Sequence, residues 1–186
     1  MNFSQLAKER YSVRKFSDQK VEKEKLDLIL EAGRVAPTAV NYQPQRILVI
    51  EAEESMAKLK SCTPFHFNAP LALLVCYDST VSWKRSHDKK EMGDVDASIV
   101  ATHMMLQAHE LGLGSTLVGH FNPDIIKESF EIPEYLVPVV LLPMGYPSSD
   151  SVPHPKMHYT RYNLNHSVFF NTFEGIVHGE NTEGQH

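Results

Sequence analysis

Residues 94–115 read DVDASIVATHMMLQAHELGLGS. From Val95 to Leu111 apolar side chains recur around the whole circumference of a predicted helix and leave almost no polar face. A helix of this kind either lies at the centre of a domain or forms a subunit interface. Asp94 or Asp96 is expected to cap its start, and the two glycines that follow it are expected to end it.

Shorter segments on both sides of this helix predict the rest of the fold. Near-continuous apolar runs predict strands covered on both faces, at residues 46–50, 71–77 and 138–144, with a further strand at 115–118. Helices are predicted over residues 4–10, capped by Ser4, 22–35, 53–60 and 122–130, the last with Asn122 as its cap and Pro123 in its first turn. The polar stretch 79–93 is predicted to be a surface excursion or lid.

Composition limits the classes of function that the chain can have. The 186 residues are 42% hydrophobic, which suits one folded domain, predicted over residues 1–170, with a tail at 171–186. A net charge of -5 provides no broad positive field and argues against a nucleic-acid partner. No stretch has the length and apolar character of a membrane span, so a cytoplasmic protein is expected.

The cysteines and histidines do not suggest a metal centre or a disulfide framework. Cys62 and Cys76 lie far apart without a C-x-x-C spacing, and the ten histidines form no paired metal motif. Cys76 lies in an apolar run, where a small buried hydrophobe is expected rather than a reactive thiol. No metal site is predicted.

The first chemical motif is Arg10-Tyr11-Ser12-Val13-Arg14. In an extended backbone alternate residues point the same way, so two guanidiniums and a hydroxyl would face one side. Such a surface suits a phosphate dianion and the polar edge of a ring. A solvated basic patch is the alternative interpretation of the same residues.

The second motif, residues 36–44, has a proline near each end and a strand directly after it. Thr38, Asn41 and Gln43 provide short hydrogen-bonding side chains between the prolines. A polar connection from helix to strand explains the composition equally well.

Taken together, the motifs resemble the nitroreductase family. An R-x-S-x-R-x-F near the start is followed by A-P-[ST]-x-x-N-x-Q-P, and residues 110–115, 118–121 and 142–147 resemble later family landmarks in the same order. The resemblance implies an α/β (α+β) fold, namely a three-layer α-β-α sandwich with a central, mostly antiparallel sheet. It also implies an intertwined homodimer with FMN bound at the interface.

The resemblance assigns roles to individual residues. The matching cofactor-binding positions are Arg10, Ser12 and Arg14 at the FMN phosphate, ribityl chain and pyrimidine edge; Thr38, Asn41 and Gln43 from the partner subunit; Gly119 and His120 near flavin N5; and Arg161 over the phosphate. Two positions depart from the family pattern: Tyr159 replaces a lysine, and His120 replaces a glycine or an acidic residue.

The implied activity is transfer of a hydride from NADH or NADPH to FMN, followed by reduction of a small electrophile such as a nitroaromatic or a quinone. No catalytic side chain is predicted, because the flavin carries the chemistry. Two alternatives keep the fold and FMN: a dehalogenase, dehydrogenase or flavin-consuming reaction, and a non-catalytic FMN carrier or sensor in which His120 shields N5.

Overall fold

The computed structural model describes residues 2–174, which fall into two compact units. The first unit ends at Pro153 and the second begins at His154. In the second unit the described chain is mostly irregular, with one short 3-10 helix at Leu164–His166. The division into a domain over 1–170 and a tail stays a prediction, and residues 175–186 of that tail lie outside the described residues.

A single antiparallel sheet organises the described part of the chain. Its strands follow the order β1-β2-β4-β3, and each neighbouring pair is antiparallel. The strands are β1 (Gln45–Ile50), β2 (Leu71–Asp78), β3 (Gly114–Ser115) and β4 (Leu136–Gly145). The three longer strands match the predicted apolar runs. The predicted strand at 115–118 is mostly wrong, because only its first residue joins the ladder and Val118 forms an isolated bridge to Leu141.

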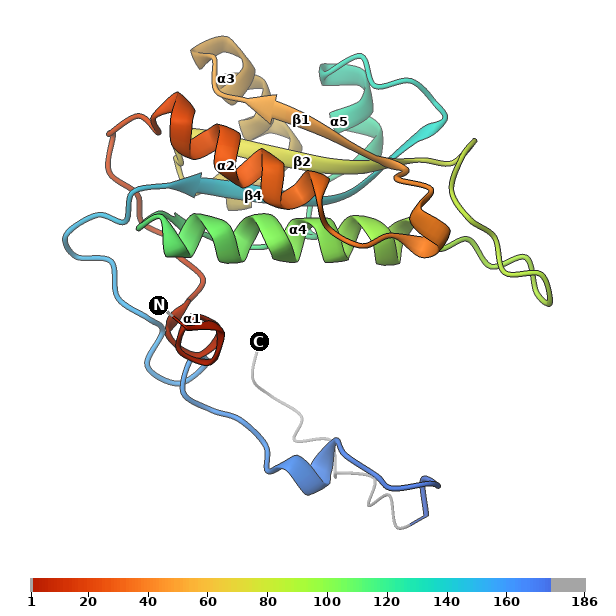
Figure 1. The fold of residues 1–186 in the computed structure, drawn as a ribbon. Helices are drawn as coiled ribbons and strands as arrows, with labels where there is room; N and C mark the ends of the chain where they lie inside the picture. Colours follow the sequence, from red (N-terminus) through yellow and green to blue (C-terminus); the bar gives the residue numbers. More distant parts are fainter. Residues whose placement is uncertain (1, 175–186) are drawn as a thin grey trace. The chain divides into compact units, whose positions relative to one another are not determined.

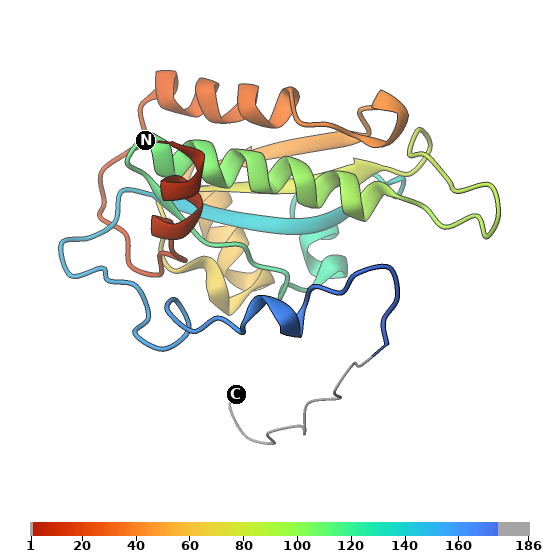
Figure 2. The same cartoon turned by 60° about the horizontal axis from the view of Figure 1, so that its bottom comes forward.

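Helices cover both faces of this sheet and produce three layers (Figures 1 and 2). They are α1 (Phe3–Glu9), α2 (Lys23–Arg34), α3 (Glu53–Cys62), α4 (Gly93–Glu110) and α5 (Pro123–Ser129), with short 3-10 turns at Ala39–Asn41 and Pro64–His66. Helices α2 and α4 pack on one face, and α3 and α5 pack on the other. The predicted three-layer sandwich with an antiparallel sheet is confirmed.

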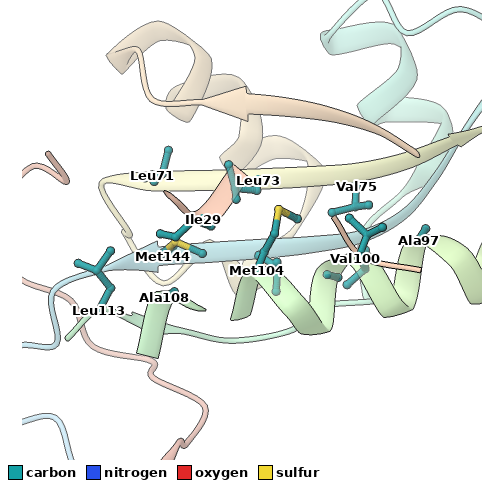
Figure 3. Close-up of a cluster of buried hydrophobic side chains, with 14 residues drawn as sticks. Ile29, Leu71, Leu73, Val75, Ala97, Val100, Met104, Ala108, Leu113 and Met144 are labelled. Atoms are coloured by element: carbon teal, nitrogen blue, oxygen red, sulfur yellow. The ribbon is translucent and has the colours of Figure 1, made fainter. Parts of the chain in front are cut away.

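Strand β2 lies at the centre of the core, and all of its residues are buried. Alternate side chains face opposite layers: Leu73 packs toward α2 and α4, and Leu74 packs toward α3 and α5. Figure 3 shows the first of these clusters, with Met104 of α4 beside Ile29 of α2. The apolar α4 therefore covers the sheet with one face, while Val95 on another face is 42% exposed.

Helix starts differ from the predictions in two of three cases. Asn122 accepts the N–H groups of the first turn of α5, as predicted. The Ser4 cap is wrong, because α1 begins one residue earlier and Asn2 caps it. The Asp94 or Asp96 cap is also wrong: α4 begins at Gly93, and both carboxylates lie inside its first turn. Asp96 is left available for another contact.

The excursion 79–93 is an ordered loop that returns on itself, as Figure 1 shows beyond the start of α4. Lys84 and Glu91 form a bridge across it, and the Met92 N–H donates to the carbonyl of Trp83 at 3.0 Å. Arg85 and Asp88 form an ion pair near its tip. Most of its charged side chains are exposed, in keeping with the predicted surface position.

Cys76 is expected to be chemically inert in the folded protein. Its side chain is 3% exposed, and burial raises the pKa of its thiol to about 11. At pH 8 only about one molecule in a thousand would carry the reactive thiolate. We expect an aromatic disulfide reagent to label Cys76 quickly after denaturation but hardly at all before it, as measured by absorbance and peptide mapping. Fast labelling of Cys76 in the native protein would contradict this expectation.

Candidate functional site

The Arg10–Arg14 segment leaves α1 and runs along β3. The Val13 N–H donates to the carbonyl of Ser115 at 3.1 Å, and Ser12 forms a parallel bridge to the same residue. Val13 is 1% exposed, whereas Arg14 is exposed. The segment therefore has the alternation expected of extended chain, with Val13 in the core and its two neighbours directed outward.

A glycine at the start of β3 permits this close approach. A Cβ added to Gly114 would lie 2.4 Å from Cγ2 of Val13, far inside van der Waals contact. Gly112, just before it, has a φ of 79°, in the left-handed region that glycine adopts without strain. The two glycines turn the chain after α4 and let β3 lie against the arginine segment.

The two guanidiniums of this segment are not neutralised by acids of the described chain. Among residues 2–174, none of the ion pairs includes Arg10 or Arg14. Arg14 donates only to the carbonyl of Ser12, at 3.3 Å. Nearby Lys15, by contrast, is paired with Asp150 at 2.6 Å. Two cations that keep their charge available beside a hydroxyl fit an anionic group such as a phosphate.

Arg10 lies near the end of α4. The pKa of His109, in the last turn of that helix, is lowered chiefly because burial disfavours the charged ring. The negative charge of Glu9 opposes this shift, and the positive charge of Arg10 adds to it. Nε2 of His109 is buried without a hydrogen-bond partner among the described residues. An uncharged His109 adds no positive charge beside Arg10 at the end of α4.

The Thr38–Gln43 segment has an unusual backbone. Val40, Asn41 and Gln43 have φ values of 54°, 56° and 51°, in the left-handed region that side chains other than glycine seldom adopt. The Gln43 N–H donates to Oγ1 of Thr38 at 3.1 Å, and the Ala39 N–H donates to Oδ1 of Asp96 at 2.8 Å. Asn41 and Gln43 are exposed. Such conformations persist where surrounding contacts hold them, and they are frequent at functional sites.

Within one chain the two motifs lie at opposite ends of α4 (Figure 1). Asp96, which contacts the Thr38–Gln43 segment, is in the first turn of the helix, whereas His109 beside Arg10 is in the last. At 1.5 Å per residue the helix separates them by about 20 Å. A single chain therefore does not bring the two sets of predicted site residues together.

The Gly119–His120 turn is linked to the arginine segment through β3. It follows β3 by four residues, on the same side of β4. Thr63 Oγ1 donates to the carbonyl of His120 at 2.6 Å, and the rings of Phe65 and His120 meet edge to face at 5.3 Å. A Cβ at Gly119 would meet nothing within 4 Å, so the space beside this backbone is open. Sequence reasoning missed Thr63 and Phe65, since their link to His120 spans more than fifty residues.

Arg161 belongs to the second unit. Its Nη1 donates to three carbonyls of its own loop, those of Met157, His158 and Thr160, at 3.2, 2.8 and 2.7 Å. Its side chain is exposed. The predicted contact of Arg161 with a phosphate stays a prediction.

Neither a metal-binding cluster nor a membrane-spanning helix is found in the part of the chain that the structure describes. Residues 2–174 contain no group of three or more His, Cys, Asp or Glu placed to hold a metal ion. In the same range no helix combines the length and the apolar character needed to cross a membrane.

Comparisons with known proteins show which sequences and folds this chain resembles. The profile of the Nitroreductase family matches residues 7–63 and 59–146. A solved nitroreductase family protein from Clostridium difficile is 48% identical, with a TM-score of 0.87 over 92% of this chain and 99% of that one. A Methanothermobacter thermautotrophicus protein named for NADH dehydrogenase or NAD(P)H nitroreductase activity is 31% identical over 81% of this chain and 80% of its own. The FMN reductase [NAD(P)H] of Bacillus subtilis is 30% identical over 78% of this chain and 66% of its own.

Proposed function

The chain belongs to the nitroreductase family, and from that premise we propose that it is an FMN-dependent oxidoreductase that takes electrons from NADH or NADPH. The observation that carries the proposal is the pair of unneutralised guanidiniums, Arg10 and Arg14, held on β3 beside Ser12. When bound, FMN would supply the redox chemistry by accepting a hydride and passing two electrons to an acceptor. The protein would supply binding, orientation and electrostatics.

Arg10, Ser12 and Arg14 fit the anionic and polar parts of FMN. A guanidinium forms paired, charge-assisted hydrogen bonds to phosphate oxygens, and a serine hydroxyl both donates and accepts. A fixed positive charge beside the pyrimidine edge would also stabilise negative charge that develops on a reduced ring. These three residues would hold the cofactor and favour its reduction without a nucleophile or a metal ion.

A second copy of the chain would complete the site. Thr38 and Asn41 belong to the segment at the start of α4, and the arginine segment lies near its end, so the two are separated by about 20 Å of helix within one chain. The exposed face of α4 has a largely apolar groove of about 480 Å³, lined in part by Val95, Ile99 and His103. Burial of this face in a homodimer would remove apolar surface from water and bring the Thr38–Gln43 segment of one copy to the other.

Gly119 and His120 would line the reactive side of the ring. The open space beside Gly119 lets its backbone approach a planar ligand, and the contact with Phe65 holds the His120 ring. The exposed excursion 79–93 would contribute to the choice of acceptor. We propose a small electrophilic acceptor, a nitroaromatic or a quinone.

Anaerobic reduction of the FMN-loaded protein tests the proposed function. NADH or NADPH is expected to bleach the visible bands of the bound flavin in a stopped-flow experiment. A nitroaromatic or a quinone, added next, should restore them. Flavin that stays oxidised with both donors would contradict the reductase and favour the carrier or sensor; flavin that is reduced but not reoxidised by either acceptor would indicate one of the other family reactions.

A further inference from the structure

Asp96 is a buried carboxylate that none of the roles described so far explains. It lies in the first turn of α4 and is 2% exposed, whereas Asp94, two residues earlier, is exposed. The helix has no side-chain cap, so Asp96 does not perform that task. A charged group is costly to bury and is retained where a specific interaction needs it.

The specific interaction is with the Thr38–Gln43 segment. Oδ1 of Asp96 accepts the N–H of Ala39 at 2.8 Å across 57 residues of sequence. The other described hydrogen bonds of this segment join it to residues close by in the sequence. One of them, from Nη1 of Arg46 to the carbonyl of Gln43 at 3.2 Å, ties its far end to β1. Asp96 therefore anchors the segment to α4 at its first residue after Thr38.

The backbone that follows this anchor needs support. Val40 and Asn41 are consecutive residues with positive φ, and Gln43 is a third. Val40 is 65% exposed, so packing around its side chain contributes little to holding the turn. Left-handed conformations of residues with side chains persist only where neighbouring contacts impose them. The hydrogen bond to Asp96 is a contact of this kind.

The second oxygen of the carboxylate supports a dedicated role. Oδ2 of Asp96 is buried and has no hydrogen-bond partner among the described residues. An apolar side chain would fill the same space without this cost. The position near the N-terminus of α4 partly stabilises the negative charge, but exposed Asp94 has the same benefit. What distinguishes Asp96 is the bond to Ala39.

We propose that Asp96 is a positioning residue, which fixes the backbone of the Thr38–Gln43 segment so that Thr38 and Asn41 are presented to FMN. The inference rests on the proposed function for the identity of the ligand. The anchor itself is a property of the chain without FMN. Loss of the bond would release the segment from α4 and weaken FMN binding through Thr38 and Asn41.

Three variants separate this role from simple packing. Asp96→Ala removes the acceptor, and Asp96→Asn keeps an amide oxygen that can accept the Ala39 N–H without the charge. Asp124→Ala is the matched control, because it removes an exposed carboxylate from the first turn of α5, a helix on the opposite face of the sheet from α4. The readouts are residue-resolved exchange of the Ala39 amide in the apoprotein, the dissociation constant for FMN by flavin fluorescence, and the melting temperature.

In the wild-type apoprotein the Ala39 amide should exchange much more slowly than that of exposed Val40, whose N–H donates no hydrogen bond within the described chain. Asp96→Ala is expected to lose this protection and to weaken FMN binding about tenfold or more, the value of a hydrogen bond to a charged acceptor. Asp96→Asn should retain most of the protection of the Ala39 amide and most of the FMN affinity, and Asp124→Ala should match the wild type.

Two results would overturn the proposal. One is an Ala39 amide that exchanges as fast as that of Val40 in the wild type, a measurement that needs neither a variant nor FMN. The other is equal loss of FMN affinity in Asp96→Asn and Asp96→Ala, which would assign the effect to charge. If the wild type fails to bind FMN, the proposed function falls, while the exchange data still decide whether Asp96 anchors the segment.

Discussion

Replacing Arg14 with alanine is expected to weaken FMN binding by about 10- to 100-fold, because a hydrogen bond between charged groups contributes roughly 1.5–3 kcal/mol. Arg14 is exposed and forms no ion pair within the described chain. Its backbone is held in place because its neighbour Val13 is buried. The side chain contributes nothing to the core, so the fold should survive. Titration of the apoprotein with FMN, followed by flavin fluorescence, measures the effect.

Two further variants make this result specific. Lys20→Ala removes an exposed positive charge from the same loop and should leave FMN binding unchanged. Arg14→Lys keeps the charge but loses the planar fork, so its affinity should fall between those of the wild type and Arg14→Ala. Equal losses in Lys20→Ala and Arg14→Ala would indicate a general electrostatic effect and contradict a phosphate contact at Arg14.

Gly114→Ala is expected to lower the free energy of unfolding by about 1–3 kcal/mol and the melting temperature by several degrees. The new Cβ would lie 2.4 Å from Cγ2 and 2.7 Å from Cβ of Val13, so β3 and the arginine segment must move apart. FMN affinity should fall as well, because Arg10 and Arg14 move with Val13. Thermal unfolding by circular dichroism measures the stability change.

A double-mutant cycle identifies the cause. Val13→Ala alone leaves a small cavity and is also destabilising. With both changes the nearest atom, Cγ2 at 2.4 Å, and Cγ1 are gone, while the Cβ of residue 13 at 2.7 Å remains, so the clash is relieved in part. The double variant should therefore be more stable than the sum of the single effects predicts. Strict additivity would show that Gly114 and Val13 do not constrain each other.

The layers of the fold could be predicted from local patterns. Continuous apolar runs indicated β2 and β4, since strands covered on both faces have no polar side, and the apolar circumference of α4 indicated a helix with more than one covered face. Asn122 and Pro123 marked the start of α5 correctly. The start of α4 was misjudged because an aspartate near a helix terminus has the same local signature whether it caps the helix or binds a distant loop. Asp96 binds the distant loop, through the N–H of Ala39, and does not cap the helix.

The arrangement of the site depends on tertiary contacts that no short motif contains. Alternation along Arg10–Arg14 was visible in the sequence, but the lack of ion pairs to these guanidiniums within the described chain was not. The separation of this segment from Thr38 and Asn41 follows from the length of α4 and from which end of it each motif contacts. Likewise, the bond from Thr63 to His120 joins residues far apart in the chain.

The central claim is that two copies of the chain build each FMN site, because one chain holds the two halves about 20 Å apart along α4. Native mass spectrometry of the protein reconstituted with FMN tests this claim most directly. We predict a species of two chains with two FMN molecules, and single chains without FMN. A single chain that retains FMN as firmly as the dimer, or a dimer that binds none, would contradict it.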